Sequence, residues 1–375
     1  MLELKKIRKY LHKYPELSGQ ESETSIYITK QLQKLGLSDI EKIGGNGIIA
    51  KTGTNEGISV LFRADIDALP IQEDTSNDNH SAHDSVMHAC GHDGHTTILL
   101  GLAEKIMKNP PKKGNVYLLF QPAEETGMGA EQVINDKKWE KYSPDFSFAL
   151  HNIPGFPLHS ILIKEEGFAS ASKGVVFKLK GKTSHAAEPE FGINPAVAVS
   201  KIIAAFEQIK EQTKLFRDKI LLTFINIQLG EIAFGTSAGY AEVRVTIRAF
   251  NNQDIELLSK LCSQIATRIA EDEKLEIDIE FVEEFPATIN HKENVHAIIQ
   301  AAEENKLEQI KLDSAFKWSE DFGHFGFISK AAMFGLGAGE KHPALHNPDY
   351  DFPDELIESG VNMFYSIYKN ILLND

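Results

Sequence analysis

Nearly continuous apolar runs separated by helical patterns constrain the fold of this chain more than any other feature of its sequence. Four runs are typical of buried strands: residues 58–66, 116–121, 146–151 and 331–337. The segments between and before them fit helices: residues 3–13, 22–36 and 95–108. Strands without polar alternation are buried on both faces. The pattern therefore predicts an α/β fold with a mostly parallel sheet covered by helices.

The middle of the chain follows a different pattern. It predicts strands and helices in the order β-α-β-β-α-β, at 174–182, 194–212, 219–229, 240–250, 251–273 and 274–285. That order is typical of a ferredoxin-like α+β domain. A helix near 293–305 then resumes the first pattern. We therefore expect a catalytic domain of residues 1–172 and 288–375, with residues 173–287 inserted into it as a second domain. Two domains also suit a length of 375 residues.

Composition excludes several classes of partner. The formal net charge is −15, whereas binding to nucleic acid or to an anionic membrane requires clustered positive charge. The two cysteines, Cys90 and Cys262, cannot form a disulfide framework. No apolar run is long enough to cross a bilayer, and the N-terminal residues lack the apolar core of a signal peptide. We expect a cytoplasmic protein with a small-molecule substrate.

Side chains that bind metals follow several of the predicted strands, where ligands bind in open α/β sheets. The candidates are Cys90 and His92 in HACGHDGH (88–95), Glu124 and Glu125 in QPAEET (121–126), His151 in ALHNIP (149–154), and His342 and His346 in HPALHNPDYDF (342–352). Taken singly, each has an ordinary structural explanation. Together, mixed cysteine, histidine and glutamate donors suit zinc, and also manganese, cobalt or nickel.

The number of donors favours catalysis over a structural role. A structural zinc ion is closed by four ligands that are commonly rich in cysteine, whereas cysteine is scarce here. A second carboxylate also stands beside the candidate ligands. We therefore expect two metal ions that activate a water molecule. We interpret His88 and His95 as supporting or structural residues.

A set of motifs in fixed order resembles the metal-dependent amidohydrolase branch of the aminoacylase/glutamate-carboxypeptidase metallopeptidase family. This branch includes hippurate hydrolases, N-acetyl-diaminopimelate deacetylases and plant auxin-conjugate hydrolases. The motifs are LHKYPELSGQE (11–21), RADIDALP (63–70), HACGHDGH (88–95), QPAEE (121–125), LHN (150–152), SHAAEPEFGINP (184–195), SEDF (319–322) and LHNPDYDF (345–352). The resemblance spans essentially the whole chain and implies a catalytic α/β domain that carries an inserted lid and dimerisation domain. A homodimer through the inserted domain is therefore expected.

The resemblance also implies a role for each matching residue. The implied ligands of two divalent metal ions per subunit are Cys90, His92, Glu125, His151 and His346, with Cys90 as the shared or bridging donor. Glu124 matches the general base, and Asp65 matches a carboxylate near the metals. His185, in the inserted domain, matches a histidine that reaches toward the scissile carbonyl.

The inserted domain departs from the family pattern. The family carries a GGT segment followed by an Asn-Val-Ile-Pro run, whereas this chain reads GEIAFGTSAGYAEVRVTIRAF (230–250) and lacks that run. Asn194 stands where aspartate is common in the histidine motif. Arg248 could pair with a substrate carboxylate, although an exposed arginine on a strand is the more ordinary explanation. His185, Asn194 and Arg248 are therefore the candidate substrate-binding residues.

These observations predict hydrolysis of an amide bond in an N-acyl amino acid or a small peptide-like substrate. Metal ions lower the pKa of water, and Glu124 takes its proton. His185 would donate to the developing oxyanion. Two alternatives stay open. Cys90 could act as a nucleophile, which leaves Glu125, His151 and His346 without a role. The chain could also be a metal-binding or small-molecule-binding protein that has lost turnover.

Overall fold

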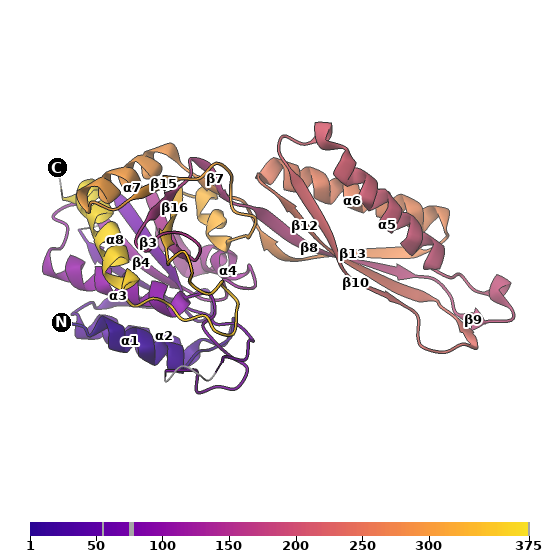
Figure 1. Ribbon diagram of the computed structural model, residues 1–375, viewed down its shortest axis with the longest axis horizontal. Helices are drawn as coiled ribbons and strands as arrows, with labels where there is room; N and C mark the ends of the chain where they lie inside the picture. The colour runs from indigo at the N-terminus through magenta and orange to yellow at the C-terminus, as the bar shows by residue number, and fades with distance from the viewer. Residues whose placement is uncertain (55, 75–78, 374–375) are drawn as a thin grey trace. The chain divides into compact units, whose positions relative to one another are not determined.

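The computed structural model describes residues 1–54, 56–74 and 79–373, and the chain divides into two compact units (Figure 1). The first unit comprises Met1–Phe168, Thr288–Ala315 and the chain from Glu320 onward; the second comprises Ala169–Ala287 and Phe316–Ser319. The boundaries differ from those predicted, since residues 169–172 and 316–319 belong to the second unit. The backbone N–H of Ser170 donates to the carbonyls of Phe316 and Trp318, which ties the two segments together.

The described part of the first unit contains an eight-stranded mixed sheet in the order β1-β2-β4-β3-β5-β16-β6-β15. Its strands are β1 (Asp39–Ile43), β2 (Gly47–Gly53), β3 (Ser59–Asp65), β4 (Asn115–Gln121), β5 (Phe146–Ile153), β6 (Ile161–Ile163), β15 (Gln309–Lys311) and β16 (Lys330–Gly337). The four central strands, β4, β3, β5 and β16, run parallel. These are the four strands that the apolar runs predict, and every residue of β3 and β4 is buried.

Helices surround this sheet. They are α1 (Leu4–Lys13), α2 (Ser22–Lys34), α3 (His92–Lys108), α4 (Gly129–Asn135), α7 (Lys292–Glu304) and α8 (Leu356–Leu372), with the 3-10 helices η1 (Lys137–Lys141) and η4 (Asp321–Phe327) and the short strand pair β7 (Glu166–Ala169) and β14 (Thr288–Asn290). Helix α3 packs against β3, α1 and α8, which explains why it is buried on almost every side. The predicted elements do not include helix α8 or the outer strands β1, β2, β6 and β15. Buried residues of α8 nevertheless recur at helical spacing, as Ile357, Val361 and Phe364 show.

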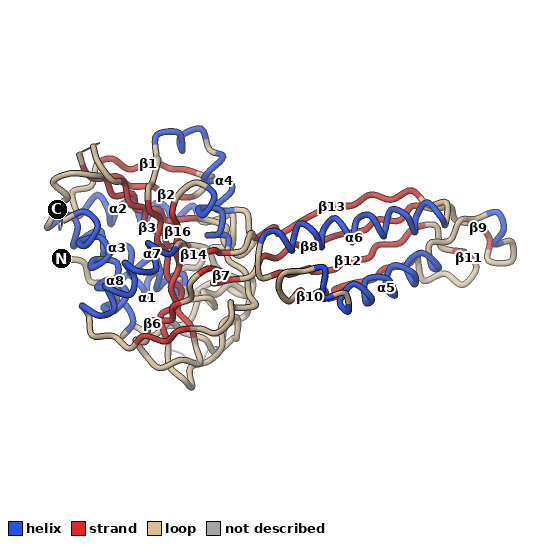
Figure 2. Tube along the Cα trace, turned by 90° about the horizontal axis from the view of Figure 1, so that it is seen from above, coloured by secondary structure: helices blue, strands red, loops and turns tan. Residues whose placement is uncertain are grey.

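The second unit has the predicted β-α-β-β-α-β order (Figure 2). Its elements are β8 (Ala171–Lys180), β9 (Ser184–His185), η2 (Pro189–Phe191), α5 (Ala196–Glu211), η3 (Thr213–Leu215), β10 (Ile220–Leu229), β11 (Thr236–Ser237), β12 (Tyr240–Ala249), α6 (Asn252–Asp272) and β13 (Glu276–Phe285). Strands β10-β12-β8-β13 form one antiparallel sheet, and β9 pairs with β11 in a separate ribbon. Helices α5 and α6 lie side by side and pack on the sheet through Phe206 and Leu258.

The start of α3 differs from the prediction in a way that matters for the site. His92 is the first residue of the helix, three residues before the predicted start, so only Cys90 lies in the preceding loop. Gly91, between them, has a φ of +90°, and a Cβ atom there would lie 2.5 Å from Oδ1 of Asn152. A side chain is therefore excluded at this position.

No helix in the described ranges is long and apolar enough to span a membrane.

Candidate metal centre

Five candidate ligands from four segments of the first unit converge at the carboxyl ends of the central strands. They are Cys90, His92, Glu125, His151 and His346, and their donor atoms form overlapping groups in which all members lie within 4.8 Å of one another. One group contains Cys90, His92 and His151; another contains Cys90, Glu125 and His346. Cys90 belongs to both, as a shared donor would. Residues separated by more than 250 positions thus meet because parallel strands end at the same edge.

Local structure places each of these side chains. The Sγ atom of Cys90 lies 3.4 Å from Nε2 of His151, which stands within β5. The backbone N–H of His346 donates to the carbonyl of Ala89 at 2.8 Å, which anchors the loop after β16 beside the Cys90 segment. Nε2 of His346 then lies 3.7 Å from Oε2 of Glu125. His342, the other histidine of that loop, turns instead to the carbonyl of Asp351.

Two buried polar atoms test whether the site fits a cation. Nε2 of His92 and Oε1 of Glu125 have no hydrogen-bond partner among the described residues, and they lie 3.8 Å apart. Leaving such atoms unsatisfied costs free energy. A cation that both atoms coordinate removes that cost. The donor set and these atoms therefore fit divalent metal ions.

Asp67 contacts two of the candidate ligands, His92 and Glu125, whereas the sequence analysis named only Asp65 as a carboxylate near the metals. Oδ1 and the carbonyl of Asp67 lie 3.2 and 3.0 Å from Nδ1 of His92. This fixes the tautomer that leaves Nε2 available for a metal ion. Oδ2 of Asp67 accepts hydrogen bonds from the backbone N–H of Glu125 and from Ser18. Its position two residues after Asp65 in RADIDALP was the signal that could have identified it.

The supporting histidines differ from one another. His95 bridges two polar groups: Nδ1 lies 2.6 Å from Oδ1 of Asp65 and Nε2 lies 2.5 Å from Oδ1 of Asn152. Both ring nitrogens of His88 are buried without a hydrogen-bond partner among the described residues, and burial lowers the pKa of His88 to about 4. Asp65 itself is fully buried, and its Oδ2 lies 3.7 Å from Nε2 of His92.

Glu124 lies beside the ligand cluster and is 5% exposed. Its carboxylate groups with His92 and Glu125 on one side and with Glu320 and Asp321 on the other. The backbone N–H of Asp321 donates to Oε1 of Glu124 at 3.4 Å. Burial and the neighbouring Glu320 and Glu125 carboxylates raise the pKa of Glu124 well above its usual range. A carboxylate in such surroundings holds a proton readily, which suits a group that must accept one.

Without cations, raised pKa values favour the protonated forms of three candidate ligands, Glu125, His92 and Cys90, near neutral pH. Burial raises the pKa of Glu125 to about 8, against the opposite effect of His92. Burial lowers the pKa of His92, but Asp65, Asp67 and Glu125 outweigh it and raise this pKa to about 10. Burial raises the pKa of the Cys90 thiol well above its ordinary value. Divalent cations favour the thiolate, the neutral imidazole and the carboxylate, so metal binding releases protons here.

The three candidate substrate-binding residues all lie in the second unit. His185, in β9, pairs with Thr236 of β11, and its Nδ1 accepts a hydrogen bond from the backbone N–H of Ala187 at 3.1 Å. The neutral ring therefore carries its proton on Nε2. Asn194 already has partners: its amide donates to Ser237 and its Oδ1 accepts from the N–H of Ala196. Arg248 donates to the carbonyl of Lys317 and to Ser319.

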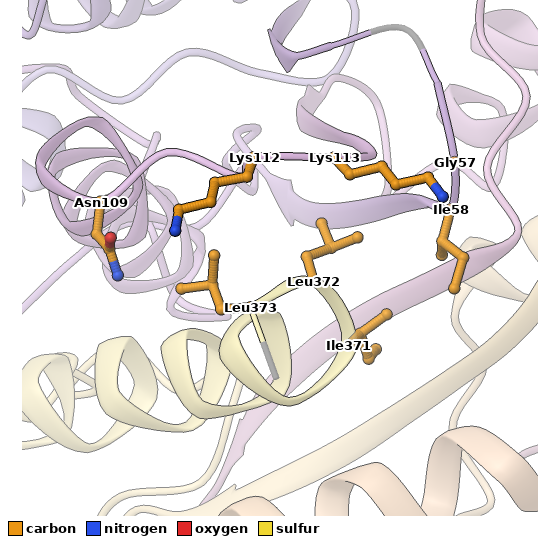
Figure 3. Close-up of a pocket in the computed structure, with 8 residues that line it drawn as sticks. All are labelled: Gly57, Ile58, Asn109, Lys112, Lys113, Ile371, Leu372 and Leu373. Carbon is orange, nitrogen blue, oxygen red and sulfur yellow. The ribbon is translucent and has the colours of Figure 1, made fainter. Parts of the chain in front are cut away.

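A surface cavity of about 380 Å³ near the end of α8 is separate from this cluster (Figure 3). Its lining includes Lys112 and Lys113, in the loop before β4, and Leu372 of α8. None of the described residues that line it is a candidate ligand.

The α/β sheet, the donor cluster at its carboxyl edge and the inserted α+β unit together define a metal-dependent hydrolase. The particular family follows from sequence: the family described as Peptidase family M20/M25/M40 matches residues 61–370, and the chain belongs to it. The expected resemblance and fold class are thereby confirmed. The chain is an enzyme of the amidohydrolase and metallopeptidase type.

Named relatives show the range of activities among similar proteins. A hippurate hydrolase from Campylobacter jejuni is 32% identical over 369 residues, which cover 96% of this chain and 94% of the relative. An N-acetyl-L-cysteine deacetylase from Bacillus subtilis is 30% identical over 368 residues, which cover 98% and 87%. A Bacillus subtilis structure, described as a dinuclear metal binding peptidase from the M20 family, has a TM-score of 0.83 at 26% identity and covers 98% of this chain and 97% of its own.

Proposed function

We propose that the enzyme hydrolyses the amide bond of an N-acyl amino acid or a small peptide-like substrate, with Glu124 as general base. The observation that carries the proposal is a pair of buried atoms, His92 Nε2 and Glu125 Oε1, that have no hydrogen-bond partner in the described part of the chain and lie beside the carboxylate of Glu124. Relatives named for hippurate and for N-acetyl-L-cysteine support this substrate class.

Cys90, His92, Glu125, His151 and His346 would hold two divalent metal ions, with zinc or manganese as the first candidates and cobalt or nickel as further ones. When bound, such ions lower the pKa of water and polarise a carbonyl oxygen. Asp67 keeps His92 in the tautomer that presents Nε2 to the site.

Glu124 provides the proton transfers. It is buried beside the donors, so it can take the proton of the attacking water and later deliver it to the leaving amine nitrogen. His185 carries its ring proton on Nε2 and can donate it to the developing oxyanion. Because Asn194 is engaged by Ser237 and Ala196, we assign it to holding the His185 ribbon and not to direct substrate contact. We keep Arg248 as a candidate for binding a substrate carboxylate.

We also propose a homodimer through the inserted unit. Strand β10 is an edge of the four-stranded sheet. The C-terminal half of β10 contains three exposed apolar side chains, Ile225, Ile227 and Leu229, which are 62%, 42% and 43% exposed. An edge strand with exposed apolar side chains favours pairing with another strand. Sedimentation of the wild-type protein and of Ile225→Lys would test this, because a charge at the interface is expected to shift a dimer toward monomer.

The environment of Cys90 weighs against a cysteine nucleophile. Its thiol is buried among carboxylates and its pKa is raised, whereas a nucleophilic cysteine requires a lowered pKa. The buried, intact Glu124 likewise weighs against a binding protein without turnover.

The test is amine release from a panel of N-acyl amino acids. The protein is measured as purified, after chelation, after reloading with manganese or zinc, and as the Glu124→Gln variant. We expect activity that vanishes on chelation, returns with metal and is lost in the variant. Activity that survives chelation but is lost in Cys90→Ser would support the cysteine nucleophile. Bound metal without turnover on any substrate would support a binding protein.

A further inference from the structure

Arg63 lies at the centre of a buried ionic network to which the proposed chemistry assigns no role. The side chain is 1% exposed. Its Nε donates to Oε1 of Gln121 at 2.9 Å and its Nη1 to Oδ2 of Asp65 at 2.6 Å. Its Nη2 donates to Oε1 of Glu320 at 2.8 Å and to Oδ1 of Asp321 at 2.9 Å. One guanidinium thus connects the ends of β3 and β4 with the start of η4.

On one side the network reaches the proposed base. Nε2 of Gln121 donates to both carboxylate oxygens of Asp321 at 2.8 Å, and the N–H of Ala130 donates to Oδ2 at 2.8 Å. Asp321 is therefore held by donors from three residues, counting Arg63. Its own backbone N–H is the one that donates to Glu124. The position of that N–H depends on how the side chain of Asp321 is held.

On the other side the network reaches the metal cluster. Oδ1 of Asp65 contacts His95, and the carbonyl of Asp65 accepts a hydrogen bond from Thr96 at 2.9 Å. Oδ2 of the same carboxylate, which Arg63 binds, lies 3.7 Å from Nε2 of His92. Arg63 thus contacts a carboxylate beside a candidate ligand with one nitrogen and the residues beside the base with another.

We propose that Arg63 is a positioning residue that fixes Glu124, through Asp321, relative to the candidate metal ligands, through Asp65. This inference rests on the proposed function. A guanidinium is planar and presents its donors in a rigid fork, so it holds several carboxylates at set distances. A lysine keeps the charge but presents one ammonium, which cannot occupy both sides. A misplacement of about 1 Å at a reacting group can reduce the rate by about 10²-fold.

The experiment compares Arg63→Lys with a matched control, Arg8→Lys. Arg8 is also a buried arginine, 2% exposed, and it donates to three carboxylates: Asp351 at 2.5 Å, Asp354 at 2.8 Å and Asp93 at 3.4 Å. Among the described residues it contacts no candidate ligand or base. For Arg63→Lys we expect kcat to fall about 10²-fold with KM within about threefold of wild type. Metal analysis should still find two ions per chain in both variants. Arg8→Lys should lower the thermal midpoint while its kcat stays within about twofold.

Each outcome of this comparison either supports or overturns the positioning role of Arg63. A folded, metal-bound Arg63→Lys with wild-type kcat would overturn the proposal, as would an equal loss of kcat in Arg8→Lys. If Arg63→Lys does not fold, Asp321→Ala provides a second test, because it removes the carboxylate that Arg63 holds and leaves Arg63 paired with Asp65 and Glu320. The backbone N–H beside Glu124 then loses its anchor, and kcat is again expected to fall. Unchanged kcat in that variant would likewise refute the role of Arg63. Failure of the proposed function is recognised separately, since the metal-loaded wild type would then show no turnover.

Discussion

The carboxyl edge of the large sheet and the ribbon that carries His185 place their functional side chains by different means. At the edge, Asp65, His92 and Glu124 are buried, and neighbouring side chains or backbone groups hold each of them. His185 is exposed on a ribbon that pairs only Ser184 and His185 with Ser237 and Thr236. Ile232 and Phe234, in the loop that leads to this ribbon, are fully exposed.

This difference separates two tasks. Proton transfer and metal binding require fixed distances, and a packed sheet supplies them. Contacts with the substrate must suit its particular shape, and loops and short ribbons can vary without disturbing the core. The same division fits the sequence, in which the motifs of the candidate ligands follow the family pattern while the Asn-Val-Ile-Pro run of the inserted unit is missing.

The largest expected effect is a loss of kcat on substitution of Glu124, at the carboxyl edge of the large sheet. Glu124→Gln should lower kcat about 10³-fold, because the amide cannot accept the proton of water. Metal content should stay at the wild-type level, since Glu124 is not among the candidate ligands. Steady-state kinetics and metal analysis on the same preparation check both statements. A variant with substantial activity would mean that another group is the base.

The ribbon should give the next largest effect. His185→Gln removes the donor proposed for the oxyanion, and the expected loss in kcat is about 10²-fold. Metal affinity should not change, because His185 is not in any of the candidate ligand groups formed by the described residues. Titration with a competing chelator, run beside the kinetics, distinguishes an effect on metal affinity from an effect on kcat. A loss of metal from His185→Gln would contradict this division of roles.

Asp67→Asn should have a smaller effect, on metal affinity, and it tests whether Asp67 orients His92 at the carboxyl edge of the sheet. The asparagine can orient its amide toward Nδ1 of His92 and favour the wrong tautomer. Replacing such a partner of a metal ligand typically lowers metal affinity by about 10–100-fold. Chelator competition measures this change directly. Ser18→Ala, which removes another partner of Asp67, serves as the control and should change the affinity much less.

The last prediction concerns the stability of the fold and the buried residue His12 of α1. Burial lowers the pKa of His12, but hydrogen bonds to Asp93 and Glu73 outweigh it and raise this pKa from 6.5 to about 10. The folded state thus binds this proton more tightly than the unfolded state. The stabilisation is complete below about pH 6.5 and is lost as pH rises through about 10.

His12→Gln should therefore be less stable than wild type by about 3 kcal/mol near neutral pH, because it leaves buried carboxylates without their partner. The difference should shrink as pH approaches 10. Thermal unfolding of the chelated proteins across this range provides the measurement. His296→Gln, on the exposed side of α7, should follow the wild-type curve. A constant gap between His12→Gln and wild type would show that the histidine contributes by packing alone.

Much of the architecture could be predicted because periodicity reports burial. The central strands β3, β4, β5 and β16 are mostly apolar and are buried along nearly their whole length, and the β-α-β-β-α-β order of the second unit follows from alternating patterns. The outer strands β6 and β15 have three residues each, too few to show a period. Residues 316–319 join the second unit through hydrogen bonds to Ser170 and Arg248, which no local pattern reveals.

The sequence by itself determined the fold class, the family and the set of candidate ligands, because each depends on residue types at short spacings along the chain. Only the tertiary structure decided which of these residues meet. In the folded chain His346 lies beside Glu125, and Asp67 contacts and orients His92. Arg63 donates hydrogen bonds to three carboxylates, those of Asp65, Glu320 and Asp321. Such contacts join residues up to 258 positions apart, and their distances are set by the packing of strands and loops, which sequence spacing does not record.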